Sequence, residues 1–271
     1  MAKFDNALQV FRLLDKSNCR MCGEKTCLAF AGAVFTGRRK LQECPTVSRE
    51  HLAKYGSAAE RAAPPAQDPA DDLFEAFSRE LAGLDLQQAA SRTGGVYNAP
   101  LLTVKVLGKD FSVDNHANFY TDIHINHWVT APFLNYVIKS RGVAPTGEWV
   151  PMRELAGGAE RYPLFRKRAE EAMQRIADVY PELFDDLVHL FSGKQITSPY
   201  DSDISVVLPV FPLVPFLICY WKPDEGMESS LKVFFDRSLD WNLDSETAFT
   251  LGAGLAQMFE KLALRHGYVP K

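Results

Sequence analysis

Apolar residues recur along the chain with two different periods, and these periods predict its elements. Intervals of three and four residues predict helices over residues 4–14, 71–90, 163–191 and 245–264. Alternation predicts strands over residues 101–106 and 231–235, and a run rich in β-branched and aromatic residues predicts strands within 204–221. The larger part of the chain is therefore expected to be α+β, with a mainly antiparallel sheet and flanking helices.

A change in composition divides the chain into two parts. Residues 56–70 hold small residues and three prolines but no large apolar residue, which is typical of a linker. The sequence therefore predicts a small helical domain over residues 1–55, a linker over 56–70 and an α+β domain over 71–271.

Hydropathy and charge argue against two classes of protein. No apolar run reaches the roughly 20 residues of a membrane helix, and prolines interrupt the longest candidate, Val206–Trp221. No signal peptide is recognised in the opening residues MAKFDN, so a cytoplasmic location is expected. No strongly basic patch is interleaved with aromatic residues, so the sequence predicts neither membrane insertion nor nucleic-acid binding.

Four of the five cysteines lie close together, at Cys19, Cys22, Cys27 and Cys44. Structural zinc sites usually use two short cysteine pairs, whereas here three thiols fall within nine residues and the fourth stands apart. This three-plus-one spacing favours a [4Fe–4S] cluster and leaves zinc as the alternative. Disulfide frameworks belong mainly to small secreted domains, so they are disfavoured here.

The surroundings of these cysteines fit an anionic cofactor. Gly23 allows a tight turn after Cys22, and the predicted helix from Cys27 to Gly37 places Cys27 in its first turn, at the positive end of the helix dipole. Residues 1–55 carry ten Lys or Arg and five Asp or Glu, although the whole chain has a net charge of −4. The basic residues either balance a cluster or form a solvated face.

The cysteine motif also carries a family resemblance. The run NCRMCGEKTCLAFAGAVFTG, followed by LQECP, resembles the four-cysteine domain of the large subunit of the corrinoid iron–sulfur protein, and related domains occur in the electron-transport complex subunit RnfB. The matching residues are Cys19, Cys22, Gly23, Thr26, Cys27, Phe30, Ala31, Cys44 and Pro45. The resemblance implies a [4Fe–4S] cluster held by Cys19, Cys22, Cys27 and Cys44.

A second resemblance covers the larger domain. The segments GEWVPMREL (Gly147 to Leu155), FPLVPFLICYW (Phe211 to Trp221) and LKVFFDRS (Leu231 to Ser238) are similar to a family of domains of unknown function, DUF3786, often joined to this cysteine module. This resemblance implies no particular reaction. Because no catalytic triad, nucleophile elbow, Rossmann fingerprint or Walker motif is found, catalytic residues stay unassigned.

A group of histidines is the second candidate for chemistry. His116, His124 and His127 lie within twelve residues, and on one helix His124 and His127 would share a face that could bind a metal or haem. Asn126 and Pro132 argue against one continuous helix here. Hydrogen-bonded packing of these histidines is the alternative to a ligand role.

Three functions follow from these features. The first is electron transfer or redox sensing through a [4Fe–4S] cluster with a redox partner protein, in anaerobic metabolism. The second is a corrinoid- or tetrapyrrole-linked protein whose cluster reductively activates that cofactor, although no cobalamin-binding D-x-H-x-x-G motif is found. The third is a zinc-stabilised interaction module without redox chemistry.

Overall fold

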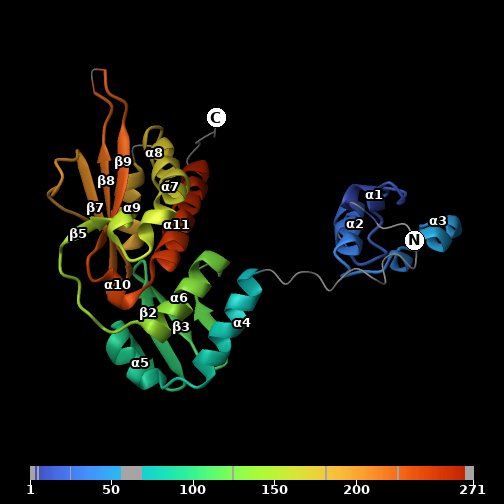
Figure 1. Ribbon diagram of the computed structural model, residues 1–271, viewed down its shortest axis with the longest axis horizontal. Coiled ribbons are helices and arrows are strands. Elements are labelled where there is room, and N and C mark those ends of the chain that lie inside the picture. The colour runs from blue at the N-terminus through green and yellow to red at the C-terminus, as the bar shows by residue number, and fades with distance from the viewer. Residues whose placement is uncertain are drawn as a thin grey trace. The chain divides into compact units, whose positions relative to one another are not determined.

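The computed structural model of the protein divides into two compact units, Met1–Asp72 and Leu73–Lys271 (Figure 1). It describes residues 4, 6–24, 26–55, 69–123, 125–180, 182–224 and 226–265. Most of the predicted linker, residues 56–68, lies outside the described residues. No helix in the described part of the chain combines the length and apolar character needed to cross a membrane.

The first unit is a small helical module. Its elements are α1 (Ala7–Phe11), α2 (Cys27–Phe35), the 3-10 turn η1 (Leu41–Glu43) and α3 (Arg49–Tyr55). Its described core consists of Val10, Leu14, Cys27, Phe30, Ala31, Val34, Leu41, Cys44 and Val47. Two cysteines thus belong to the apolar core of the module, so what those thiols bind affects how the module packs.

Capping residues set where these helices begin. The Thr26 side chain accepts the N–H of Ala29, so α2 begins at Cys27 as predicted. The Ser48 side chain accepts the N–H of His51 ahead of α3. Helix α1 is shorter than the predicted helix over residues 4–14, because Asn6 caps its start and residues 12–14 form a turn and a bend in place of a further helical turn.

The first part of the second unit is a layer of helices on an antiparallel sheet. The predicted helix over residues 71–90 is two helices, α4 (Pro69–Ala82) and α5 (Leu86–Thr93), because the Asp85 carboxylate accepts two N–H groups and starts a new helix. The sheet has the order β1-β2-β3-β4. Its strands are β1 (Val96–Asn98), β2 (Leu101–Val106), β3 (Lys109–Val113) and β4 (Phe119–Thr121).

A second antiparallel sheet, of order β5-β9-β8-β7-β6, makes up the rest of the strands. The strands are β5 (Trp149–Pro151), β6 (Lys194–Gln195), β7 (Ile204–Phe211), β8 (Val214–Trp221) and β9 (Ser230–Asp236). Strand β7 is irregular between Pro209 and Phe211, where a proline cannot donate to the ladder. The predicted α+β fold with a mainly antiparallel sheet is confirmed.

Helix α6 (His127–Lys139) joins the two sheets. It runs through Pro132, which the sequence indicated as an interruption. Its Tyr136 ring stacks on Phe211 of β7 at 4.6 Å, and the Tyr136 hydroxyl donates to the Thr93 carbonyl at 2.8 Å. The buried side chains of both sheets therefore form one continuous core.

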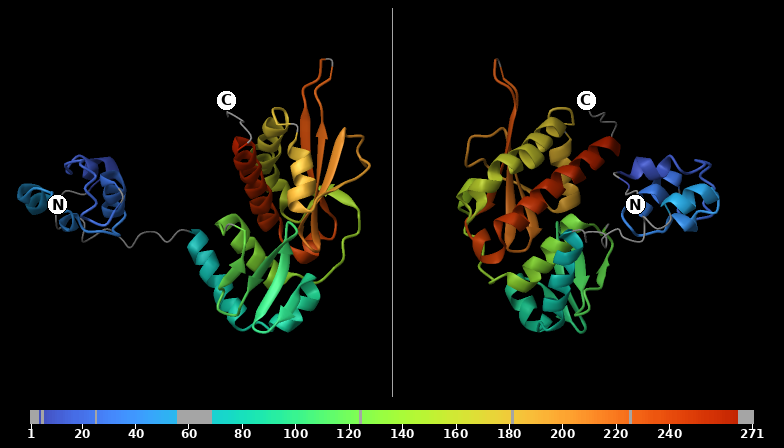
Figure 2. Two further views of the ribbon diagram at one scale, coloured as in Figure 1. Left: turned by 180° about the vertical axis from the view of Figure 1, so that it is seen from behind. Right: turned by 45° about the vertical axis from the view of Figure 1, so that its right-hand side comes forward.

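The remaining helices cover the second sheet. They are the 3-10 turn η3 (Met152–Glu154), α7 (Gly158–Phe165), the π-turn η4 (Arg166–Glu170), α8 (Glu171–Ala177), α9 (Leu183–Phe191), α10 (Leu239–Asn242) and α11 (Ser245–Arg265). Helices α7, α8 and α11 lie together on one side of this sheet (Figure 2). The predicted helix over residues 163–191 is divided among α7, η4, α8 and α9, and Pro181 lies outside the described residues.

The π-turn places a carboxylate against the sheet. Glu170 is buried, pairs with Lys232 at 3.1 Å and accepts the N–H of Val233 at 3.2 Å. Strand β5 pairs β9 only along Phe234–Asp236, so the Glu170 side chain satisfies a β9 donor beyond the end of β5. The π-helical turn η4 thus has a structural role, because it carries the carboxylate that satisfies this donor.

Replacement of Gly108 by alanine is expected to destabilise the protein by about 2–4 kcal/mol, from left-handed strain and overpacking together. Leu107 and Gly108 form the β2–β3 turn with φ of +48° and +77°. A Cβ atom on Gly108 would lie 2.0 Å from the Ser192 hydroxyl oxygen. Urea unfolding at equilibrium measures the loss.

The Ser192→Gly background separates these two causes. Ser192 itself has a left-handed φ of +56°, so glycine is tolerated there. Gly108→Ala should cost about half as much in that background, because the clash is gone and the backbone strain stays. An equal cost in both backgrounds would contradict the steric argument.

Candidate metal centre

The loop that carries Cys19 and Cys22 has an unusual backbone. Lys16, Asn18 and Arg20 adopt left-handed φ values of +64°, +52° and +62°, and Gly23 follows at +83°. Each non-glycine residue in this region costs about 1 kcal/mol or more, and such strain clusters at functional sites. Turns with left-handed residues also direct backbone N–H groups into concavities that bind anions, including iron–sulfur centres.

Asn18 ties this loop to the start of α2. Its side-chain oxygen accepts the Cys27 N–H at 2.8 Å, and its own N–H donates to the Cys27 sulfur at 3.3 Å. The first bond satisfies one of the free donors at the helix N-terminus. The second places a donor on the sulfur, and hydrogen bonds to thiolates are one of the controls on cluster potential.

The four candidate thiols occupy different environments. Cys27 and Cys44 are buried in the core of the module, Cys22 is half-buried against the same core, and Cys19 is exposed. The Cys44 sulfur lies 3.2 Å from the Thr46 hydroxyl. Three of the four predicted ligands thus border one apolar core, and the fourth lies on the left-handed loop.

The four thiols are candidate ligands for a cluster and not for a single ion. Within the described residues, no three Cys, His, Asp or Glu side chains form a group that could hold a metal ion. The donor set, the helix N-terminus at Cys27 and the N–H group on its sulfur all suit a negatively charged cluster.

Arg39 links the segments that carry Cys22 and Cys44. Its guanidinium pairs with Glu43 at 2.8 Å and lies 3.7 Å from Glu24. A Cβ atom on Gly23 would lie 3.2 Å from its Nη2 atom, so glycine leaves room for this arginine. The hydrogen bond and charge of Glu43 raise the pKa of Arg39, and the charges of Glu24 and Cys22 add to the effect.

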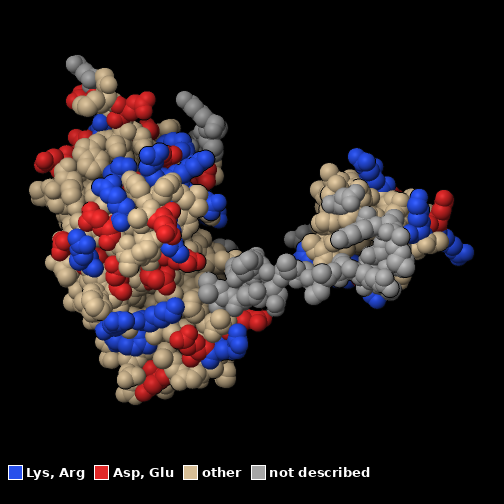
Figure 3. Space-filling model, viewed as in Figure 1, with Lys and Arg blue, Asp and Glu red and all other residues tan. Residues whose placement is uncertain are grey.

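The visible surface of the module carries more basic than acidic side chains, as the sequence predicts (Figure 3). On the body, both signs of charge are interspersed, with basic side chains in two bands on the viewed face. The module therefore has an electrostatic character different from that of the body, which suits an anionic cofactor or an acidic partner.

The predicted histidine site is only partly described. His116 and His127 are both exposed, and His124 lies outside the described residues. Helix α6 begins at His127, and Ile125 and Asn126 before it are not helical, so no helical turn precedes His127 directly. The buried group nearby is Asp114, which accepts hydrogen bonds from the backbone N–H groups of His116 and Asn118.

The fifth cysteine lies in the body. Cys219 is buried in β8, 3.3 Å from the Ser205 hydroxyl, and burial raises the pKa of its thiol. A buried free thiol of this kind packs as a small apolar residue.

Two contributors to the site were not predicted. Asn18 and Arg39 hold the cysteine segments in place, but neither is a ligand type for iron. Asparagine directly before the first cysteine is a usable signal for Asn18, because it enters the left-handed region more readily than most residues. The Arg39 contacts depend on the fold of the loop and have no local signal.

The fold and the cysteine site define an iron–sulfur module joined to an α+β body, and comparison with known families agrees. The chain belongs to the DUF3786 family, whose model, described as "Domain of unknown function (DUF3786)", matches residues 85–258. A second family model, FeS, described as "Putative Fe-S cluster", matches residues 14–46. This second match contains all four cysteines of the module.

Two curated proteins are similar to part of the chain. One is the acetyl-CoA decarbonylase/synthase complex subunit gamma of Methanopyrus kandleri, 38% identical over 63 residues. The other is the corrinoid/iron-sulfur protein large subunit of Moorella thermoacetica, 46% identical over 41 residues. The matches cover 23% and 15% of this chain but only 13% and 9% of those proteins. No solved structure matches the chain.

Proposed function

We propose that Cys19, Cys22, Cys27 and Cys44 bind a [4Fe–4S] cluster and that the protein transfers electrons to a partner protein. A bound cluster accepts and donates single electrons at a potential set by its charge, exposure and hydrogen bonds to sulfur. The observation that carries the proposal is the pair of bonds between Asn18 and Cys27, which places a loop N–H on a buried ligand sulfur.

The residues of the module have separate roles in this proposal. Cys27 and Cys44 lie in the apolar core, so the side of the cluster that they bind is shielded from solvent. Cys19 lies on the exposed loop, so this side gives the shorter path to a partner. Arg20, next to Cys19, and Arg38, after α2, are exposed cations that favour an acidic partner surface.

Similarity to the Moorella thermoacetica protein, whose name includes a corrinoid, favours a second candidate. In that candidate the cluster reduces a corrinoid or another tetrapyrrole on this chain or on a partner. The match covers only 41 residues and 9% of that protein, so the similarity supports a corrinoid less directly than the FeS family model supports the cluster.

Anaerobic purification followed by iron and sulfide analysis tests the first part of the proposal. About four irons and four sulfides per chain, with an EPR signal that develops on dithionite reduction, are expected for a [4Fe–4S] centre. Zinc without iron or sulfide, in protein never exposed to air, would contradict the proposal and leave a zinc-stabilised interaction module. Added corrinoid that is reduced by the loaded protein would favour the second candidate.

Substitution of Asn18 by glycine or alanine tests the loop contacts. Both variants lose the side-chain acceptor of the Cys27 N–H, but glycine keeps the left-handed backbone without strain. Asn18→Ala should weaken the loop by about 2–3 kcal/mol, the sum of one hydrogen bond and one left-handed penalty, and Asn18→Gly by about 1 kcal/mol.

The rate at which a chelator removes iron measures this difference. Iron loss is expected to be fastest from Asn18→Ala, slower from Asn18→Gly and slowest from the unaltered protein. Equal rates for all three proteins would mean that Asn18 does not hold the cluster loop.

A further inference from the structure

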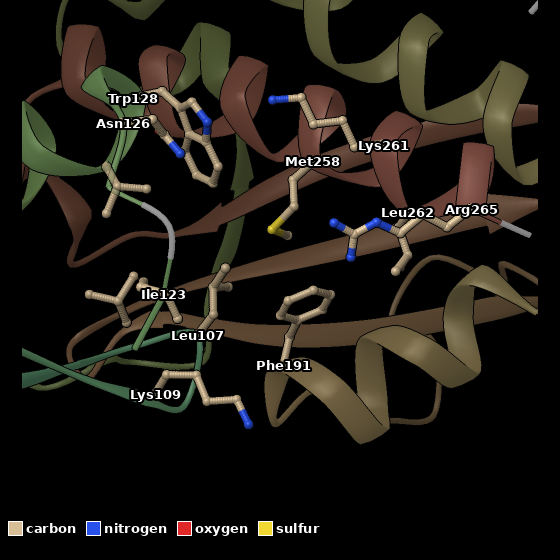
Figure 4. A pocket seen from close by; sticks show the side chains of 12 residues that line it. Leu107, Lys109, Ile123, Asn126, Trp128, Phe191, Met258, Lys261, Leu262 and Arg265 are labelled. Carbon is tan, nitrogen blue, oxygen red and sulfur yellow. The ribbon is translucent and has the colours of Figure 1, made fainter. Parts of the chain in front are cut away.

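The body contains a pocket that the cluster does not explain. Its volume is about 500 Å³, within the range of sites for small molecules. Its walls come from the β2–β3 turn, the chain before and at the start of α6, the end of α9 and the last turns of α11. Figure 4 shows the side chains that line it, with Met258, Lys261, Leu262 and Arg265 from α11.

The described lining combines apolar walls with positive charge. The apolar members are Val106, Leu107, Ile123, Trp128, Val129, Phe191, Met258 and Leu262. Three cations, Lys109, Lys261 and Arg265, also line the pocket, and none of its described lining residues is acidic. None of these three cations forms an ion pair with a residue that the structure describes.

The positions of these cations are not explained by helix stability alone. Arg265 lies in the last turn of α11, where a cation suits the helix dipole. Lys261 stands four residues earlier, and like charges at this interval repel each other by a few tenths of a kcal/mol. Lys109 belongs to strand β3, on a different wall, so the dipole of α11 has no bearing on it.

The wall opposite α11 carries backbone strain. Leu107 is a bulky residue with a left-handed φ of +48°, and its buried side chain lines the pocket. Its N–H donates to the Val210 carbonyl at 3.2 Å, which joins the turn to the second sheet. A strained turn held by both sheets makes a preformed wall, and strain of this kind is typical of binding sites.

We infer that this pocket binds an apolar small molecule that carries a carboxylate or phosphate group. The aromatic and aliphatic walls would enclose the apolar part, between Phe191, Trp128 and Met258. Lys261 and Arg265 of α11 would neutralise the anionic group, and the guanidinium of Arg265 can bind either group in a bidentate manner. Lys109, on the facing wall, adds positive charge to the pocket.

Calorimetric titration of the full-length, cluster-loaded protein tests this inference. The probes are naphthalene-2-carboxylate, 2-naphthyl phosphate and the neutral naphthalene-2-carboxamide. At least one anion should bind saturably at one site per chain, about tenfold more tightly than the amide, which corresponds to about 1.4 kcal/mol. The preferred anion distinguishes a carboxylate ligand from a phosphate ester.

Paired charge substitutions locate the site. Lys261→Gln with Arg265→Gln should weaken anion binding about tenfold and leave the amide unchanged, because only the anion interacts with the removed charges. Lys167→Gln with Arg168→Gln is the matched control, since these two exposed cations do not line the pocket. Leu262→Trp should block all three probes by filling the pocket.

Several outcomes would overturn the inference. These are no saturable binding, equal affinity for the anions and the amide, an equal loss of affinity in the two charge pairs, or unchanged binding in Leu262→Trp. Urea unfolding of each variant shows whether it is folded. The Lys261 and Arg265 pair of substitutions should leave the unfolding midpoint unchanged or slightly raised, whereas a purely structural role at the end of α11 predicts a lower midpoint.

Discussion

Replacement of Cys27 by serine is expected to remove the cluster from the protein and to unfold the module while the body stays folded. Cys27 is buried in the module's core, begins α2 and bonds with Asn18. Metal binding by small metallo-domains contributes on the order of 10 kcal/mol to folding, and a domain this small has few other sources of stability. Loss of one thiolate therefore affects the whole unit.

Three measurements on the anaerobically purified variant check this expectation. Iron and sulfide should fall from about four per chain to near zero. Limited proteolysis should degrade residues 1–55 rapidly and leave the body as a resistant fragment. The urea unfolding transition of the body should keep its midpoint, because the body has its own continuous core.

Cys219→Ser is the matched control, because it removes the one thiol outside the module. It should keep the iron and sulfide content and change only the stability of the body. Full iron content in Cys27→Ser would exclude Cys27 as a ligand, and equal iron loss in both variants would show that the loss is not specific to the thiols of the module. Cys19→Ser adds a further comparison. Because Cys19 is exposed, its replacement should abolish the cluster with little direct loss of core packing.

Local patterns predicted the parts of the structure that depend on nearby residues. The start of α2 follows from Thr26 as a helix cap, and strands β7, β8 and β9 follow from their β-branched and aromatic runs. The split between α4 and α5 was missed, because the helical spacing of apolar residues continues across Asp85 and conceals the new cap. The run of α6 through Pro132 was missed because burial against both sheets outweighs one lost backbone bond.

The two candidate sites differ in the same respect: one is a local motif, and the other depends on the fold. The four cysteines form a local motif, so the sequence predicts them as one group of candidate ligands. The pocket was not predicted, because Lys109, Phe191 and Arg265 come from three separate elements and meet only in the folded body. The left-handed turn at Leu107 and Gly108 likewise depends on the fold, since leucine is a poor choice for a left-handed position.

Replacement of Asp236 by alanine is expected to destabilise the body by about 3–5 kcal/mol, because it leaves several buried donors without an acceptor. Asp236 ends β9 and is 1% exposed. Its carboxylate accepts the backbone N–H groups of Thr146, Gly147 and Ser238 at 2.9, 2.6 and 2.9 Å, and the Thr146 hydroxyl at 3.1 Å. These bonds hold the segment before β5 against the second sheet.

Equilibrium urea unfolding measures this effect, with two comparisons. Asp236→Asn should cost about half as much, because its oxygen can keep the three Oδ1 bonds while its NH₂ group faces the N–H of Gly147. Asp110→Ala should cost less than about 1 kcal/mol, because Asp110 forms an exposed pair with Lys105. Similar losses for Asp236→Ala and Asp110→Ala would contradict the buried network.

The stabilisation by Asp236 also depends on pH in a defined direction. Burial raises the pKa of Asp236, but bonds from Thr146, Ser238 and Gly147 outweigh burial and leave the pKa below its ordinary value of 3.8. Because the unfolded chain binds the proton more tightly, the contribution is present above about pH 4 and is lost as the pH falls through the lower folded pKa. The difference in unfolding free energy between the unaltered protein and Asp236→Ala should therefore be constant from pH 7 to about 5 and shrink below about 4. A difference that stays constant down to the acid transition would mean that the Asp236 carboxylate is not the stabilising group.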